Sequence, residues 1–454
     1  MDEIGFVGRA LPPYILGPCL LLFLFVMVTV IRRTPGRAAR FVLFAVSIRY
    51  VLSALHEITY GPTPVGLSIN ALGSIAVFAL GLFIVRRRRV LDPALLPFYP
   101  LLLIMAASGL VNAQLSSLAT ALTKYAYLLV LILATIDALE DIGPERLFKK
   151  LLWCFSFPGT LQIFSIVMRW SKPGENDGAA SYIGGYYHEA GFSMVLAAGL
   201  LVTCFAGNLR LRYRLLLIGA LMAGIVFANY RTAILGIMPL VGAALLVVGP
   251  SRFVPRQRSI VLGAVLLVAT ATVSLGAIAE RDRFADIGFA ISRGTSLIKP
   301  PGTFSTEERR TMSGRPAIWS QYLYAWYDGS PVRKMIGFGP ETWGKAFRLY
   351  AHNTLVSTLY EIGVMGVFAT LFLWGWMLAL ALMARGSPIL VLAAAHLGFF
   401  ILNMATMPMW MIEGMIYYGL LCGYTVYAYQ RRRRPVPSPQ PAAGEFSGVR
   451  LASR

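Results

Sequence analysis

His352 is the residue of this chain whose type and position best suit acid–base chemistry. It opens the segment 352–366, in which a polar, titratable head precedes an apolar run and follows a charged stretch. Imidazole exchanges a proton near neutral pH with little tuning, which is what activation of a hydroxyl group requires. We expect His352 to act as a general base and Asn353 to help bind the same ligand. The alternative for His352 is a cap at the start of a helix.

Two arginines stand where they suit an anionic ligand. Arg231 follows a hairpin so short that its guanidinium must lie at the end of two apolar segments, where snorkelling towards lipid headgroups is the alternative reason for it. Arg315 follows a Ser-Gly turn and begins an apolar stretch that predicts a short helix. A guanidinium grips two phosphate oxygens at once, so we expect both arginines to hold a phosphate or diphosphate. The alternative for Arg315 is a helix-start arginine facing water.

The segment that contains Tyr187, His188 and Glu189 suits a carbohydrate. Aromatic rings fit the faces of sugars, and a carboxylate fits their hydroxyl groups, so we expect these three residues to bind substrate. An interfacial belt of aromatic residues is the alternative. No Asp-X-Asp or similar carboxylate cluster accompanies them on the predicted outer face, and we predict neither a metal nor a cofactor.

The elements that must position these residues are membrane helices. The chain is 57% hydrophobic and 14% charged, with a mean hydropathy of +0.65, which indicates a polytopic membrane protein. Backbone groups in lipid must be satisfied within their own segment, and the apolar runs lack the alternation of barrel strands. We therefore predict an all-α integral membrane bundle of about 12–13 transmembrane helices. The expected spans are 12–31, 41–60, 67–85, 94–110, 115–136, 151–168, 190–207, 213–230, 232–249, 259–279, 362–384, 388–405 and 409–428.

The distribution of basic residues predicts the orientation of these helices. Short connections rich in Lys and Arg stay in the cytoplasm, and alternate connections of this chain carry them. The net charge of +20 is then a signal of topology, helped by attraction to anionic membrane lipids, and not of a nucleic-acid partner. Threading the spans accordingly leaves the N terminus, the stretch from about 280 to 351 and the start of the His352 segment on the outer face.

The same threading divides the chain into four parts. The parts are N-terminal transmembrane helices over 1–279, one long outer loop over 280–351, C-terminal transmembrane helices over 352–429 and a disordered cytoplasmic tail over 430–454. The loop is rich in Lys and Arg, which suits an anionic ligand at the outer interface. The tail is predicted from its arginine block followed by Pro, Ala, Ser and Gly.

Taken together, these landmarks resemble the O-antigen ligase and polysaccharide polymerase superfamily of bacterial membrane proteins. The resemblance covers about 185–366. It rests on Arg231 followed four positions later by Leu235, on Ser313-Gly314-Arg315 with Ile318-Trp319, on Ile336-Gly337-Phe338-Gly339-Pro340, and on His352-Asn353 followed after nine residues by Gly363-Val364-Met365-Gly366. Members commonly have twelve helices and both termini in the cytoplasm, whereas thirteen helices would place this N terminus outside.

The resemblance implies a membrane enzyme that transfers a glycan from an undecaprenyl-diphosphate donor to a sugar hydroxyl at the periplasmic face of the bacterial inner membrane. It implies an inverting, metal-independent displacement in which His352 is the base and Arg231 and Arg315 hold the donor diphosphate. The glycan acceptor decides between a polymerase of exopolysaccharide or O-antigen units, which we favour, and a ligase onto lipid A core. Other polysaccharide assembly proteins are possible partners.

Two other classes of protein fit parts of the same pattern. A flippase or exporter of lipid-linked saccharides would need a charged central cavity open to both faces, for which Arg49 and Lys124 are the obvious candidates. A non-catalytic scaffold of an assembly complex would use the outer loop as an interaction surface. Substitution of His352 separates the scaffold from the enzyme.

Overall fold

A computed structural model describes most of the chain outside its two ends and the stretch between 252 and 293. The described residues are 7–64, 66–173, 180–251, 257, 263, 294–306, 308–309, 314–384 and 388–433. Among them, the only strands are β1 (Lys172–Pro173) and β2 (Ala180–Ser181), which pair antiparallel. All other regular structure in these ranges is helical, which confirms the all-α prediction.

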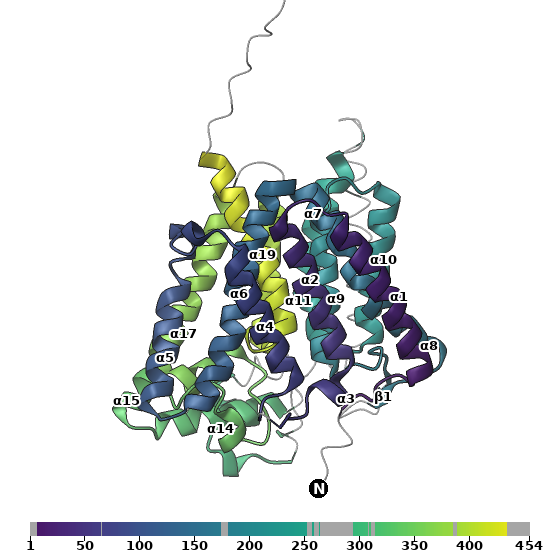
Figure 1. The fold of residues 1–454 in the computed structure, drawn as a ribbon. Coiled ribbons are helices and arrows are strands. Elements are labelled where there is room, and N and C mark those ends of the chain that lie inside the picture. The colour runs from purple at the N-terminus through teal and green to yellow at the C-terminus, as the bar shows by residue number, and fades with distance from the viewer. Residues whose placement is uncertain are drawn as a thin grey trace, which may run out of the picture.

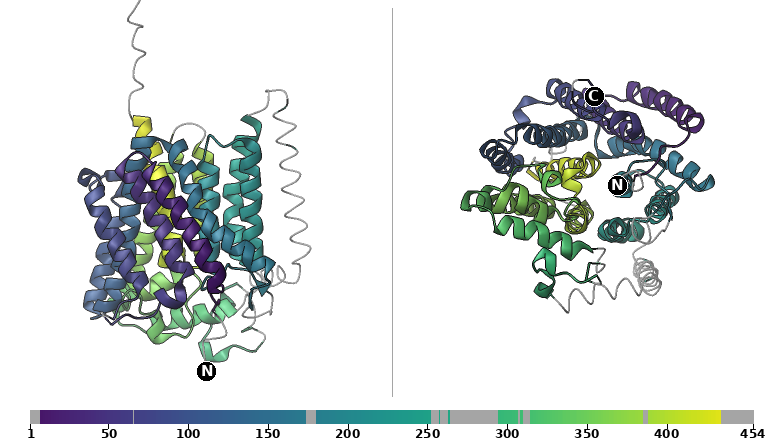
Figure 2. Two further views of the ribbon diagram at one scale, coloured as in Figure 1. Left: turned by 45° about the vertical axis from the view of Figure 1, so that its right-hand side comes forward. Right: turned by 90° about the horizontal axis from the view of Figure 1, so that it is seen from below.

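The long helices stand side by side as one bundle (Figures 1 and 2). They are α1 (Pro13–Arg32), α2 (Arg37–Ala54), α4 (Ile69–Ile84), α5 (Phe98–Val111), α6 (Leu115–Ile142), α8 (Ser156–Val167), α9 (Glu189–Phe205), α10 (Leu211–Phe227), α11 (Arg231–Ser251), α17 (Thr354–Leu382), α18 (Pro388–Ala405) and α19 (Ile412–Arg433). Each matches one expected span, and the span expected at 259–279 lies outside the described residues except for residue 263.

Five helices among the described residues are long and apolar enough to cross a membrane. These are α1, α6, α17, α18 and the continuous run Pro144–Val167, which joins α7 (Pro144–Leu151), the 3-10 turn η4 (Leu152–Phe155) and α8. Their outward faces are apolar: Leu21 and Phe25 of α1 are 70% and 72% exposed. In water this would be an exposed hydrophobic patch, so the helices indicate a membrane protein.

The two ends of the bundle differ in their connections. At one end, here called the basic end, Arg86 and Arg89 bind carboxylates in the last turns of α6, and Arg432 donates to the Met383 carbonyl at 2.9 Å. The other end, here called the loop end, holds α14 (Arg315–Tyr327), α15 (Pro331–Ile336) and α3 (His56–Thr59) (Figure 1). The N-terminal segment joins the loop end, because Gly8 donates its backbone N–H to the Tyr187 carbonyl at 2.8 Å.

Helices α9 and α19 form the centre of the bundle. Almost every residue of α9 is buried, and α9 packs against α10, α11 and α19. Helix α19 also packs along α6, where a Cβ added at Gly419 or Gly423 would lie 2.9 Å from Leu131 or 2.6 Å from Thr135. Small residues let neighbouring membrane helices approach closely, so these glycines set the α6–α19 spacing.

The predicted loop 280–351 contains α14, the short helix expected at Arg315, and also α15 and α16 (Trp343–Ala346). Helix α19 runs to Arg433, past the expected end at 429, because contacts of Gln430 with Asp92 and Arg89 and of Arg432 with Met383 hold its last turn. The rest of the expected tail, 434–454, lies outside the described residues.

Candidate functional site

Arg231 and Arg315 each begin a helix at the loop end. Asn229, with a φ of +54°, turns the chain before α11, and Gly314, with a φ of +80°, turns it before α14. Both conformations are left-handed, which glycine adopts freely and asparagine tolerates. The Arg315 guanidinium donates to the hydroxyl of Thr232 at 3.4 Å. Because Thr232 follows Arg231 directly, this contact places the starts of the two helices next to each other.

Contacts of α14 also bring His352 into this neighbourhood. Trp319, one turn after Arg315, donates its indole N–H to the Ala351 carbonyl at 2.8 Å, and Tyr322 donates to the Leu349 carbonyl at 2.9 Å. His352 itself has a φ of +50°, an uncommon value for a residue with a side chain. Its ring packs on Tyr350, with the ring centroids 3.9 Å apart. The backbone and the stacking partner together fix where the imidazole lies.

The cap of α17 is Asn353 and not His352. The Asn353 side-chain oxygen accepts hydrogen bonds from the backbone N–H groups of Leu355 and Val356 at 2.9 and 3.1 Å, the usual role of an N-cap. Its amide donates to the Met404 carbonyl at 3.0 Å. The alternative that His352 caps the helix is therefore wrong. Three polar contacts also give Asn353 a structural role, and its contact with substrate stays a prediction.

Helix α18 supports both α11 and α17. A Cβ added at Gly398 of α18 would lie 2.1 Å from the Gly236 carbonyl oxygen of α11, so the two backbones touch. At the loop end of α18, Asn403 accepts a hydrogen bond from Thr354 of α17 at 2.6 Å. One helix thus fixes the segments that carry Arg231 and His352 relative to each other.

The two glycine motifs near His352 form a backbone-to-backbone packing site. Phe338 and Gly339 donate their N–H groups to the carbonyls of Tyr360 and Glu361 at 3.0 and 2.9 Å. There α17 is kinked, with a φ of +70° at Gly363, and a Cβ at Gly363 would lie 2.3 Å from the Met335 oxygen. A Cβ at Gly337 would lie 2.3 Å from the Glu361 oxygen. These glycines dock the loop onto α17, and the sequence alone did not reveal that role.

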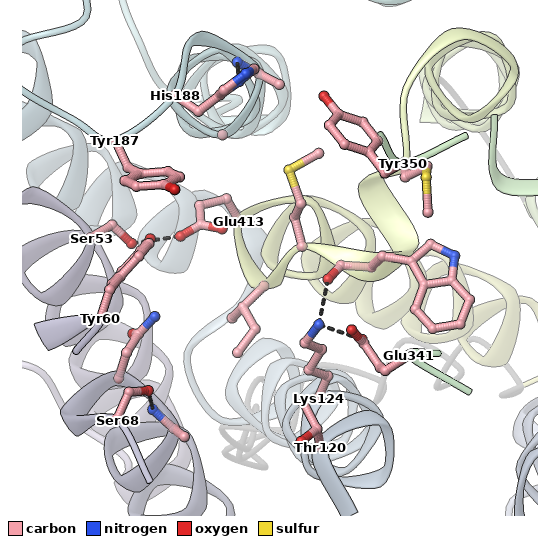
Figure 3. A pocket seen from close by; sticks show the side chains of 18 of the residues that line it. Ser53, Tyr60, Ser68, Thr120, Lys124, Tyr187, His188, Glu341, Tyr350 and Glu413 are labelled. Carbon is pink, nitrogen blue, oxygen red and sulfur yellow. Dashed lines mark hydrogen bonds and ion pairs between the residues drawn. The ribbon is translucent and has the colours of Figure 1, made fainter. Parts of the chain in front are cut away.

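A cavity of roughly 1340 Å³ opens among the helices at the loop end (Figure 3). Its lining comes from the end of α2, the first turns of α4, α6, α9, α14 and α19, the 3-10 turn η8 (Pro408–Trp410) and connecting loops that include the one before α17. Tyr187 and His188 line it, and so does Tyr350, the stacking partner of His352. The lining residues all lie in the half of the bundle nearest the loop end.

Two ion pairs lie in the cavity wall. Arg49 binds Glu413 at 3.0 Å, with both side chains less than one tenth exposed, and Ser53 donates to the same carboxylate at 2.5 Å. Lys124 pairs with Glu341 and donates to the Trp410 carbonyl at 3.0 Å (Figure 3). Both pairs join segments far apart in the sequence. The positive charges of Arg49 and Lys124 are therefore compensated inside the wall.

The three residues expected to bind sugar take different positions. Tyr187 is 40% exposed and packs against Tyr60 and His56, with ring centroids 5.3 and 5.5 Å apart. His188 caps α9 by accepting the N–H of the residue two positions later at 3.1 Å. Glu189 does not line the cavity and pairs with buried Lys172 at 2.6 Å. Tyr187 and His188 thus border the cavity, and the carboxylate of Glu189 has a structural partner.

Sequence reasoning missed Glu413 and Glu341. A signal for Glu413 was present, because it is a carboxylate near the start of an apolar run and ionisable groups in membrane helices usually pair with one another. Arg49, in another apolar run, is its partner. Glu341 lies in the loop and carried no such signal. The described residues contain no group of three or more His, Cys, Asp and Glu side chains placed to hold a metal ion.

No protein-family model matches the chain, and no curated protein matches it.

Proposed function

We propose that this protein is a glycosyltransferase of the bacterial inner membrane that moves a glycan from an undecaprenyl-diphosphate donor to a sugar hydroxyl at the periplasmic face. The observation that carries the proposal is the pair of contacts made by α14. Arg315 reaches Thr232 at 3.4 Å, and Trp319 reaches Ala351 at 2.8 Å. Through them, three segments that hold Arg231, Arg315 and His352 gather at the loop end.

The chemistry proposed for these side chains follows from their charges. His352 accepts the proton of the acceptor hydroxyl as that oxygen attacks the anomeric carbon of the donor sugar. The bond from that carbon to the diphosphate breaks, and Arg231 and Arg315 stabilise the negative charge that develops on the leaving group. Placement at the end of a membrane bundle suits a donor whose diphosphate lies at the lipid surface while its polyprenyl chain stays in the bilayer.

The cavity argues against a flippase of lipid-linked saccharides. A flippase should hold its ligand in a charged cavity that reaches both faces, and Arg49 and Lys124 were the expected charges. Both line the cavity, but Glu413 and Glu341 bind them, and every lining residue belongs to the loop-end half of the bundle. A polymerase and a ligase share the donor chemistry, and we favour a polymerase of exopolysaccharide or O-antigen units.

The test is complementation of a deletion strain of the native host. Arg231→Ala and Arg315→Ala should abolish polymer or lipopolysaccharide synthesis and make the lipid-linked repeat unit accumulate. Arg212→Ala, which removes an exposed arginine at the basic end, should retain synthesis and serves as the matched control. Normal product from both loop-end variants, at normal membrane levels of protein, would refute the proposal. Product attached to lipid A core instead of polymer would identify a ligase.

A further inference from the structure

We infer that the cavity wall formed by Tyr60, Tyr187, Ser68 and Thr120 is a binding site for an uncharged saccharide, and that this saccharide is the acceptor of the transfer. The acceptor role rests on the proposed function, whereas the saccharide site rests on the wall itself. Tyr60 and Ser68 come from the α2–α4 side, Thr120 comes from α6, and Tyr187 precedes α9. Figure 3 shows Tyr60, Tyr187 and Ser68 on one side of the cavity and Tyr350 across from them.

This wall places aromatic rings beside hydroxyl groups. Tyr60 and Tyr187 pack together with ring centroids 5.3 Å apart, and Tyr187 keeps 40% of its surface exposed. Ser68 uses its oxygen to accept the Ala71 N–H at 3.1 Å, so its hydroxyl proton can still be donated. Thr120 donates to the Ser116 carbonyl at 3.1 Å, so its oxygen can still accept. Ring faces beside such groups match the apolar faces and hydroxyls of a sugar.

The charge of this wall favours a neutral ligand. Its cation Arg49 is bound by Glu413, and its cation Lys124 is bound by Glu341. Arg309 and Arg348, the other arginines of the lining, belong to the loop segments before α14 and α17. Because carboxylates already neutralise Arg49 and Lys124, the Tyr60–Tyr187 wall suits a neutral polyhydroxylated ligand, which does not lose the hydration of a charge on binding.

The wall belongs to the same cavity as neighbours of His352 and Arg315. Tyr350, which packs on His352, lines the cavity, and so do Ile318 and Gln321 of α14, the helix that Arg315 begins. Arg231, Arg315 and His352 themselves do not line it. An inverting displacement needs its nucleophile and its leaving group on opposite faces of the transferred sugar. An acceptor held in the cavity and a diphosphate held by the arginines outside its lining occupy separate sites, as that displacement requires.

The test measures binding of neutral oligosaccharide fragments, prepared from the surface polysaccharide of the native host, to the purified full-length protein in nanodiscs. Tyr187→Ala should weaken binding roughly tenfold, and Tyr213→Ala should not change it. Tyr213 is 49% exposed at the basic end and matches Tyr187 in residue type and exposure. Thr120→Val should also weaken binding, with Thr29→Val as its control because both hydroxyls donate to the carbonyl four residues earlier.

The outcomes separate this inference from the proposed function. Equal binding by the wild type, Tyr187→Ala and Thr120→Val would overturn the inference and leave the transferase proposal standing. Binding that depends on Tyr187 and Thr120 and survives in His352→Ala, while transfer is lost, would support the acceptor site. The same binding together with full transfer by His352→Ala would support the saccharide site and refute the proposed catalytic role of His352.

Discussion

The two ends of the bundle both carry dense charge but use it differently. At the basic end, Arg86 binds Glu140 and Asp141 at 2.6 and 2.7 Å, and Arg89 binds Asp137 at 2.5 Å. Those contacts tie the α4–α5 connection to the last turns of α6. At the loop end, the Arg49–Glu413 and Lys124–Glu341 pairs lie in the wall of a cavity. The segments that carry Arg231, Arg315 and His352 meet at the same end.

The surroundings of each charge cluster decide its role in the bundle. The basic cluster is compact and joins neighbouring helix ends, which is a structural role. The Arg49–Glu413 pair joins α2 to α19 next to a cavity, so it shapes the cavity as well as holding the helices.

Replacement of His352 should have the largest effect. If His352 is the base, His352→Ala should lower the rate of glycan transfer by roughly 10²–10⁴-fold, the usual contribution of general base catalysis. His352→Gln keeps a polar side chain but no base and should be equally inactive. The measurement is single-turnover transfer from purified donor, with membrane levels of protein as the control. A fall of less than about threefold would remove His352 from the mechanism.

Breaking the buried ion pair should strongly destabilise the bundle. Glu413→Leu leaves the Arg49 charge buried without its partner, which typically costs about 3–5 kcal/mol. The double variant Arg49→Met with Glu413→Leu removes both charges and should recover most of the loss. Thermal unfolding in detergent measures both variants. A double variant no more stable than Glu413→Leu would show that the pair acts in some other way.

A methyl group at Gly337 should displace the loop from α17. Gly337 has a φ of +77°, and its added Cβ would lie 2.3 Å from the Glu361 oxygen, so Gly337→Ala should cost at least about 1–3 kcal/mol of stability. Gly344→Ala is the matched control in the same loop, because its Cβ would meet nothing within 4 Å. Its effect should stay within about 0.5 kcal/mol. Equal melting temperatures for the two variants would contradict the docking role of Gly337.

Loss of Arg86 at the basic end should have the smallest effect. Arg86 is 53% exposed, and Arg89 would still bind Asp137 in its absence. Arg86→Ala should therefore cost no more than about 1 kcal/mol and leave glycan transfer unchanged. Thermal unfolding and the transfer assay measure the two effects. A loss of transfer in this variant would contradict the purely structural role of the charges at the basic end.

The sequence predicts the bundle well because hydropathy and helix length are local properties. The Ser-Gly turn before Arg315 likewise predicts α14, and Asn353-Thr354 before an apolar run is a helix-start signal whose cap is Asn353. The cavity and its ion pairs depend on contacts between distant segments. Arg49 and Glu413 are 364 residues apart, and hydropathy does not encode which helices become neighbours. For the same reason the kink at Gly363 appeared in the sequence only as a glycine motif.

In the proposed transferase, Arg231 and Arg315 hold one diphosphate at the loop end. A double-mutant cycle shows whether they share this ligand, using the Kd of undecaprenyl diphosphate for the wild type, Arg231→Ala, Arg315→Ala and the double variant. Each single variant should bind more weakly, and the double variant should lose clearly less than the sum of the two losses, since both side chains share one ligand. Losses that add within about 0.5 kcal/mol, or unchanged affinity in either single variant, would contradict it.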